Sequence, residues 1–222
     1  MANFRGHITT SAALGVAVGA FGVLRLQYDW GPVLLAAGLT TIGGMLPDLD
    51  SDSGIPVREL FGLAGILVPL LLTERLRRAG FTTEEQLVIL GGIYLLVRYG
   101  VAEIFKRLTV HRGMFHSIPA LFIAGLVVFL IHLPSAVPSA TMGPDELRKR
   151  LYIATGTMIG FFSHLALDEL FAVDLMGLVP RANKFAGSAL KFMSRSWSAT
   201  LITYAILGVL AYLAWISVSK DL

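Results

Sequence analysis

The chain has no cysteine and little charge. Without cysteine, disulfides and thiolate metal sites are excluded, so any bound metal takes nitrogen and oxygen ligands. Charged residues make up 15% of the 222 residues, and the formal net charge is only +3. Lys and Arg sit between the apolar runs, which indicates membrane orientation and phosphate contacts rather than a nucleic-acid face. We therefore expect no nucleic-acid partner.

Long apolar runs dominate what is present. Hydrophobic residues make up 55% of the chain, and the mean hydropathy is +0.71. Runs of ~20 residues are long enough to cross ~30 Å of hydrocarbon, so they predict an all-α, polytopic membrane helical bundle. We expect one integral membrane domain over residues 1–222, with about seven spans, or six if the second is re-entrant. The expected spans lie near 9–26, 33–46, 57–73, 86–104, 117–133, 151–171 and 197–215.

Two segments outside these spans have alternative interpretations. Residues 181–196 mix basic and apolar side chains, which fits a basic interfacial helix and equally a solvated loop. Arg5, the apolar stretch after it and Val18-Gly19-Ala20 also resemble a secretory signal peptide, whose cleavage would remove His7. Basic residues are balanced between the two predicted sides, so the positive-inside rule leaves the orientation open.

Imidazole and carboxylate groups recur at four places beside the apolar runs. Because charged and polar groups are costly in hydrocarbon, they need partners there. His164 and Asp168 are four residues apart and so project from one helix face, as two metal ligands or as a helix-packing hydrogen bond. The predicted metal ligands are His7, Asp48, Asp50, His111, His116, His164 and Asp168.

Three further charged residues are candidates for chemistry. Arg112 lies between two of the histidines and stays protonated, so it is predicted to hold a phosphate or carboxylate oxygen. Arg98 and Glu103 lie in the expected fourth span, either as an ion pair within the bundle or as a phosphate-binding group and a general base. The seven-span topology puts all four imidazole and carboxylate groups at one membrane face.

These motifs together resemble a known family. His7, Leu46-Pro47-Asp48-Leu49-Asp50, His111-Arg112-Gly113-x-x-His116-Ser117 and His164-Leu165-x-Leu167-Asp168 resemble the YdjM-type family of LexA-binding, inner-membrane-associated metal-dependent hydrolases. The resemblance implies a multi-pass inner-membrane hydrolase with these residues as its site, and it suggests a regulatory protein partner. Type 2 phosphatidic acid phosphatases share only the His-x-x-x-Asp spacing, since Thr157-Met158 stands where their Ser-Arg should be.

The predicted function is hydrolysis of a phosphoester of a lipid or lipid-linked molecule. One or two divalent ions would activate water, with Zn²⁺ expected from the mixture of His and Asp, and with Mn²⁺ or Mg²⁺ as alternatives. Membrane lipids, and an anionic lipid or lipid-phosphate substrate, are the expected partners. The two competing functions are a metal or proton transporter and a non-enzymatic membrane anchor for a regulatory protein.

Overall fold

The structure is a computed structural model in which the chain forms two compact units. Unit 1 comprises residues 1–47 and 114–222, and unit 2 comprises residues 48–113. The described residues are 4–50, 55–103, 114–131, 144–174, 181–182, 190–194 and 196–219. Within them the fold is helical, apart from a pair of two-residue strands.

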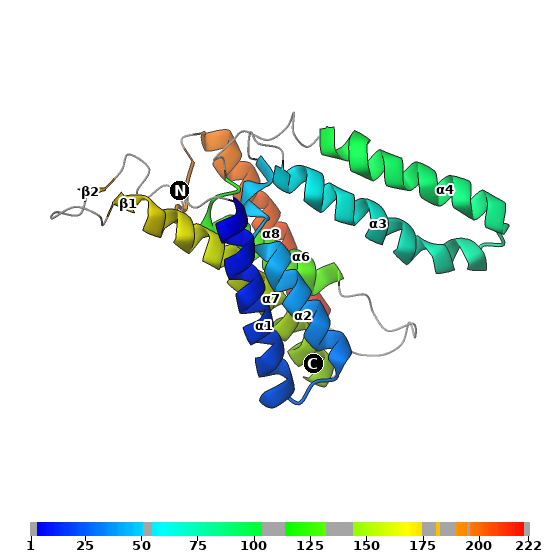
Figure 1. Ribbon diagram of the computed structural model, residues 1–222, viewed down its shortest axis with the longest axis horizontal. Coiled ribbons are helices and arrows are strands. Elements are labelled where there is room, and N and C mark those ends of the chain that lie inside the picture. Colours follow the sequence, from blue (N-terminus) through cyan, green and yellow to red (C-terminus); the bar gives the residue numbers. More distant parts are fainter. Residues whose placement is uncertain are drawn as a thin grey trace. The chain divides into compact units, whose positions relative to one another are not determined.

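Unit 1 is a bundle arranged around one long helix, α7 (Figure 1). α7 packs against α1, α2 and α6, while α8 packs against α6. Just after the C-terminal end of α7, strand β1 pairs antiparallel with strand β2. The elements are α1 (Phe4–Leu24), α2 (Trp30–Gly43), α6 (Ile118–Ile131), α7 (Pro144–Phe171), β1 (Val173–Asp174), β2 (Arg181–Ala182) and α8 (Trp197–Ser219).

Small residues let the backbones of unit 1 approach closely. The buried positions of α1 include Ser11, Gly15 and Gly19, a stripe with four-residue spacing. A Cβ added at Gly160 of α7 would overlap the carbonyl oxygen of Thr40 in α2. Such contacts suit helices in lipid, where packing and hydrogen bonding rather than the hydrophobic effect hold helices together. The face of α1 that carries these small residues is therefore a helix–helix interface.

Unit 2 is a helical hairpin. Its α3 (Ile55–Arg78) packs against α4 (Thr83–Leu95) and against the π-helix η2 (Leu96–Val101) that continues α4. The turn between them contains Gly80 at a φ of 87°, a conformation that glycine adopts without strain. Thr82 then caps α4 through a capping box with Glu85. The 3-10 helix η1 (Pro47–Asp50) begins at the last residue of unit 1 and enters unit 2.

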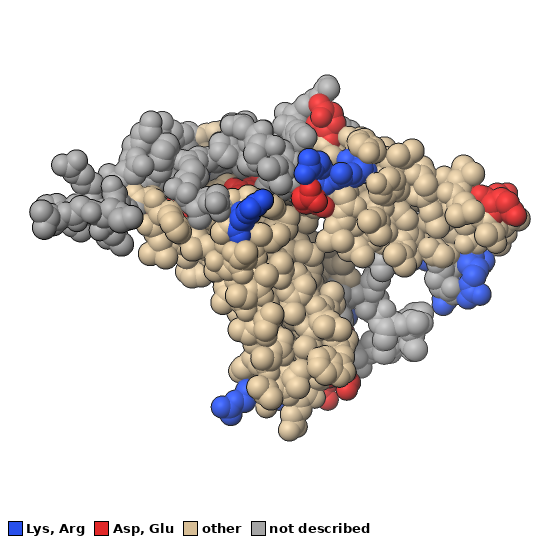
Figure 2. All heavy atoms as spheres, viewed as in Figure 1, with Lys and Arg blue, Asp and Glu red and all other residues tan. Residues whose placement is uncertain are grey.

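The prediction of an all-α fold is confirmed, whereas the number of spans is not established. Of the helices in the described ranges, α1 and α8 are long and apolar enough to cross a membrane, and α2 and α6 are shorter apolar helices. On the viewed face of unit 1, charged side chains lie toward the ends and the middle is uncharged (Figure 2). In the predicted interfacial segment, residues 181–182 form β2, and residues 190–194 and 196 are not helical. Its interfacial role remains a prediction.

Candidate metal centre

His7 belongs to the buried stripe of α1. It lies four residues before Ser11, so the helix directs both side chains to the same face. Ser11 Oγ donates to the carbonyl oxygen of Thr41 at 3.1 Å, which holds this face of α1 against α2. The His7 side chain is therefore only 3% exposed, although it lies in the first turn of its helix.

His164 and Asp168 lie one turn apart on the buried face of α7. His164 is 0% exposed and Asp168 is 6% exposed. His164 Nδ1 lies 2.8 Å from the carbonyl oxygen of Gly44, just after the end of α2. Since a carbonyl only accepts, Nδ1 carries the proton and Nε2 carries the lone pair. This hydrogen bond sets both the tautomer and the ring orientation, as carbonyls do for metal-binding histidines.

His116 enters from the non-helical residues that precede α6. Met114 and Phe115 form a turn, and His116 follows as a bend with 2% exposure. Ser117 then caps α6 by accepting a hydrogen bond from the Ala120 N–H at 3.3 Å. Because the chain leaves the turn at His116, the imidazole comes from a loop that the α6 cap holds in place.

The three imidazoles surround one carboxylate. Asp168 Oδ1 lies 3.3 Å from His7 Nε2, and Asp168 Oδ2 lies 3.8 Å from Nε2 of both His116 and His164. These distances exceed the ~2.7–3.2 Å of ordinary N–H···O hydrogen bonds. Ligand atoms bound to Zn²⁺ at ~2.0–2.1 Å lie ~3.3 Å apart in a tetrahedral site. The spacing therefore suits groups that share an ion better than groups that bond to one another.

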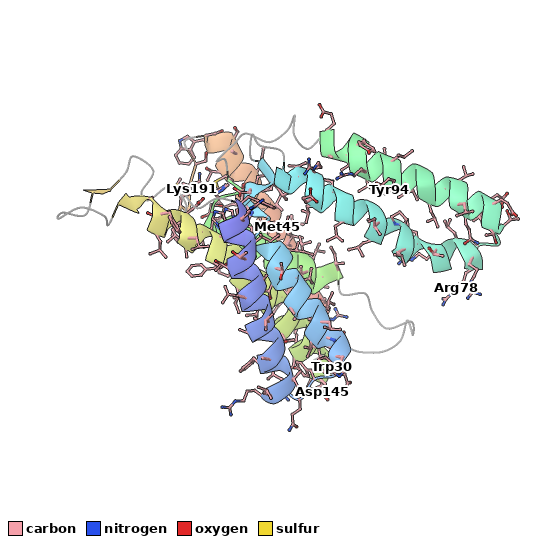
Figure 3. All side chains as sticks on the ribbon, viewed as in Figure 1. Trp30, Met45, Arg78, Tyr94, Asp145 and Lys191 are labelled. Atoms are coloured by element: carbon pink, nitrogen blue, oxygen red, sulfur yellow. The ribbon has the colours of Figure 1, made fainter. Side chains whose placement is uncertain are left out.

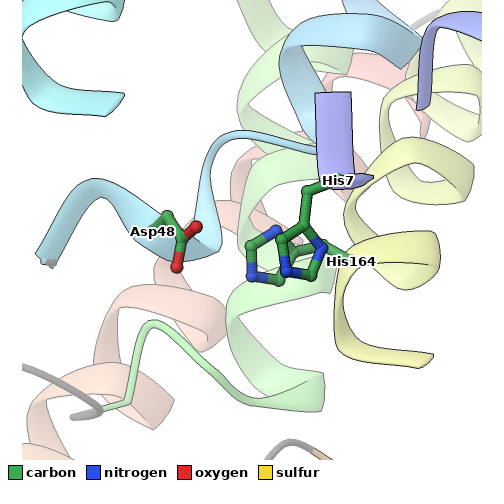
Figure 4. Close-up of side chains that lie close together, drawn as sticks. All are labelled: His7, Asp48 and His164. Carbon is green, nitrogen blue, oxygen red and sulfur yellow. The ribbon is translucent and has the colours of Figure 1, made fainter. Parts of the chain in front are cut away.

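The His7 and His164 rings pack face to face. Their centroids are 3.7 Å apart and their planes are 15° apart (Figure 4). Neutral imidazole is the form that binds metal. Among the described residues, His7 Nδ1 and Asp168 Oδ1 are buried without a hydrogen-bond partner.

The structure therefore brings together four of the predicted ligands in unit 1: His7, His116, His164 and Asp168. His116, His164 and Asp168 each offer a ligand atom, and these atoms lie within 4.8 Å of one another. Buried groups that can hold a metal ion are thus present, and they come from two helices and a loop that are far apart in the sequence.

The other predicted residues lie elsewhere or outside the described ranges. His111 and Arg112 are outside them, as is the side chain of Asp50. Asp48, also labelled in Figure 4, is the first residue of unit 2. The remaining two, Arg98 and Glu103, belong to unit 2 as well.

Arg98 takes part in the packing of the unit 2 hairpin. Its Nη1 donates to the carbonyl oxygen of Arg58 in α3, and its guanidinium lies 5.8 Å from the ring centre of Tyr99. Glu103 is exposed at the end of the described helix. These contacts test neither interpretation of Arg98, the ion pair within the bundle or the phosphate-binding group, so both stay predictions.

Sequence reasoning missed the carbonyl of Gly44 and the pairing beside His116. The signal for the first was the pair Gly43-Gly44 at the end of an apolar run, since small residues there allow α2 to reach α7 closely. The second is the bridge between Ser117 and Lys191, in which the Ile118 N–H donates to the Lys191 carbonyl at 3.1 Å. No local pattern in the sequence indicates that contact.

The helices and this cluster define a helical membrane protein with a buried three-histidine, one-aspartate site. The chain belongs to the family of YdjM inner membrane proteins, which it matches over residues 1–221. No match was found among curated proteins or among solved structures.

Proposed function

We propose that this protein is a membrane-embedded, metal-dependent hydrolase whose metal is held by His7, His116, His164 and Asp168. The observation that carries the proposal is the arrangement of three buried imidazole Nε2 atoms at 3.3–3.8 Å from the oxygens of one buried carboxylate. A buried carboxylate and buried histidines are costly unless their charges and lone pairs are used. A shared divalent cation meets that requirement for all four side chains at once.

The donor set favours Zn²⁺. Three imidazoles and one carboxylate are borderline ligands that suit Zn²⁺, whereas Mg²⁺ prefers a shell of oxygens. Mn²⁺ stays an alternative. A divalent ion at such a site supplies Lewis-acid activation of water and of the scissile group. His164 is oriented for this by Gly44, and His7 would bind through Nε2 with its buried Nδ1 carrying the ring proton.

The predicted motifs that supply further ligands remain predictions. Asp48, Asp50 and His111 stay predicted metal ligands, and Arg112 stays the group predicted to stabilise negative charge on the substrate. Arg98 and Glu103 remain predicted catalytic residues. Their variants should therefore lose hydrolytic activity while keeping most of the free energy of unfolding. If the further predicted ligands hold a second ion, the metal content per chain should be about twice that of a protein with one ion.

The depth of the cluster supports an enzyme over a transporter. His7 is the fourth residue of α1, so it lies ~4.5 Å along the axis from the start of that 21-residue helix. Transporters generally bind their ions near the bilayer midplane, ~15 Å in. We propose further that the chain is multi-pass, with this site near one membrane surface.

The surroundings of the cluster support an anionic substrate. Lys191 is tied by backbone pairing to Ser117, the neighbour of His116 (Figure 3). The chain thus brings the backbone of one basic residue beside the loop that holds His116. A lipid phosphoester is the substrate that combines negative charge with a membrane location.

The test is metal content and phosphoesterase activity of Asp168→Asn against Asp145→Asn. Both lie on α7, but Asp145 is 88% exposed and at the other end of the helix. We expect Asp168→Asn to lose the metal by elemental analysis and to lose hydrolysis of a lipid phosphoester, while Asp145→Asn keeps both. An Asp168→Asn protein with full metal content would refute the site. If Asp168→Asn loses the metal but the wild-type protein hydrolyses no phosphoester, the metal site stands and only the proposed reaction is refuted.

A further inference from the structure

A groove of about 580 Å³ runs along unit 1 between α1 and α7. Its walls are mainly apolar, and they include Leu14, Val18, Phe21, Leu151 and Ile159. Its volume lies within the ~300–1,000 Å³ range of small-molecule sites. Among the described residues that line it, Arg148 is the one that carries a charge.

The length of the groove matches one leaflet of a bilayer. From Arg148 to Ile159 it follows 11 residues of α7, or ~16 Å at 1.5 Å per residue. Half of the ~30 Å hydrocarbon thickness is ~15 Å. The opposite wall belongs to α1, which is long and apolar enough to cross the membrane. The groove therefore has the reach of one acyl chain.

Aromatic side chains form the end of the groove near Arg148. Tyr152 donates a hydrogen bond to the Val18 carbonyl at 2.8 Å, and its ring meets that of Tyr28 edge-on at 5.3 Å. Trp30 and Asp145 lie toward the same end of unit 1 (Figure 3). Tyr and Trp are enriched at the level of lipid headgroups, so this end belongs at a membrane interface.

The guanidinium of Arg148 is available to a headgroup. It is 74% exposed and lies 4.0 Å from Asp145, in a pair too exposed to hold it strongly. Arg150 differs, because it is buried and donates to Glu146 at 3.0 Å. A guanidinium binds a phosphate through two parallel hydrogen bonds.

We propose that this groove binds one acyl chain of an anionic phospholipid, with the phosphate on Arg148. Arg148 lies 16 residues before His164 on the same helix, or ~24 Å along its axis. A headgroup bound there is out of reach of the histidine cluster. The lipid is therefore a bound component of unit 1 and not the substrate of the proposed hydrolase.

The test uses the full chain, delipidated in mild detergent and titrated with phosphatidylglycerol or phosphatidylcholine of equal chain length. Native mass spectrometry counts the bound lipids. We expect one phosphatidylglycerol to bind preferentially, Arg148→Gln to weaken it by about tenfold or more, and Ala17→Trp to block the groove. Arg75→Gln in unit 2 and Val16→Trp, exposed on α1 but outside the groove, are matched controls.

Several results would overturn the proposal. If Arg148→Gln and Ala17→Trp bind the lipid as the controls do, the groove is not its site. Equal binding of the two lipids would refute the preference for an anionic lipid, since both headgroups carry a phosphate and differ in net charge. A change in the monomer–dimer ratio of Ala17→Trp without a change in lipid binding would make the groove a contact between copies of this chain. Thr155→Phe, exposed on the α7 wall, replaces Ala17→Trp if that variant does not fold.

Discussion

The close approach of α2 and α7 at Gly160 can be tested by adding one methyl group. A Cβ at Gly160 would overlap the Thr40 carbonyl oxygen and would also contact the Gly44 nitrogen at 3.1 Å. Both are backbone atoms, which cannot swing aside as a side chain can. Gly160→Ala must therefore push α2 and α7 apart, and overpacking of this kind costs ~1–3 kcal/mol.

A second effect of Gly160→Ala acts on the metal site. The same separation moves the Gly44 carbonyl away from His164 Nδ1, which is now at 2.8 Å. Loss of such an orienting contact lowers metal affinity by about 10–100-fold in comparable sites. Because Gly160 is not itself a ligand, weakened metal binding by this variant would come from displaced ligands, the His164 ring among them.

Gly38→Ala is the matched control for this experiment. Gly38 lies on α2, and a Cβ added there would meet nothing within 4 Å. Because alanine favours the helix, Gly38→Ala should stabilise the protein by ~0.5–1 kcal/mol. The two variants should therefore differ by ~1.5–4 kcal/mol in the free energy of unfolding.

The assays are unfolding by sodium dodecyl sulfate in mixed micelles and metal affinity by competition with a chelating dye. We expect Gly160→Ala to be less stable than wild type and to bind metal more weakly, while Gly38→Ala changes metal affinity little. The reasoning fails if Gly160→Ala matches Gly38→Ala in both assays. Lower stability with unchanged metal affinity would retain the packing argument and refute the role of the Gly44 carbonyl.

Two further predictions concern the capping box of unit 2 and the crossing of α8. Thr82→Ala removes the cap that joins Thr82 and Glu85, so we expect ~1 kcal/mol less local stability and faster hydrogen exchange in the first turn of α4, with the remainder of unit 2 unaffected. For α8, the absence of cysteine allows clean single-site labelling through Ser196→Cys and Ser219→Cys. The 23-residue helix is ~34 Å long, so an impermeant thiol reagent should label the two cysteines from opposite sides of the membrane, and labelling from one side would refute the crossing.

Much of the local structure could be read from the sequence. The capping box at Thr82 and the cap at Ser117 each depend on residues three positions apart, and the structure contains both. The pairing of His164 with Asp168 follows from helical spacing alone. The bounds of the helices were less predictable: α2 ends at Gly43, three residues before the expected end of the second span, because apolar residues continue past the last helical turn.

The number of membrane crossings could not be read with the same certainty. In a membrane protein, lipid-facing and bundle-facing sides are both apolar, so hydropathy does not separate them. α7 illustrates the difficulty, since it carries the buried His164 and Asp168 and also charged residues in its first two turns. Composition alone identifies the membrane class and leaves the path of such a helix open.

The sequence by itself determined the helical class, the exclusion of thiolate ligands and the groups available for a metal, because these depend on residue type and on spacing within one helix. Only the tertiary structure decided that His7, His116, His164 and Asp168 meet, and that Gly44 orients His164 from 120 residues away. The physical reason is that periodicity directs a side chain to one face of its own helix. Which faces then pack together depends on the small residues that allow close approach and on contacts between segments distant in the chain.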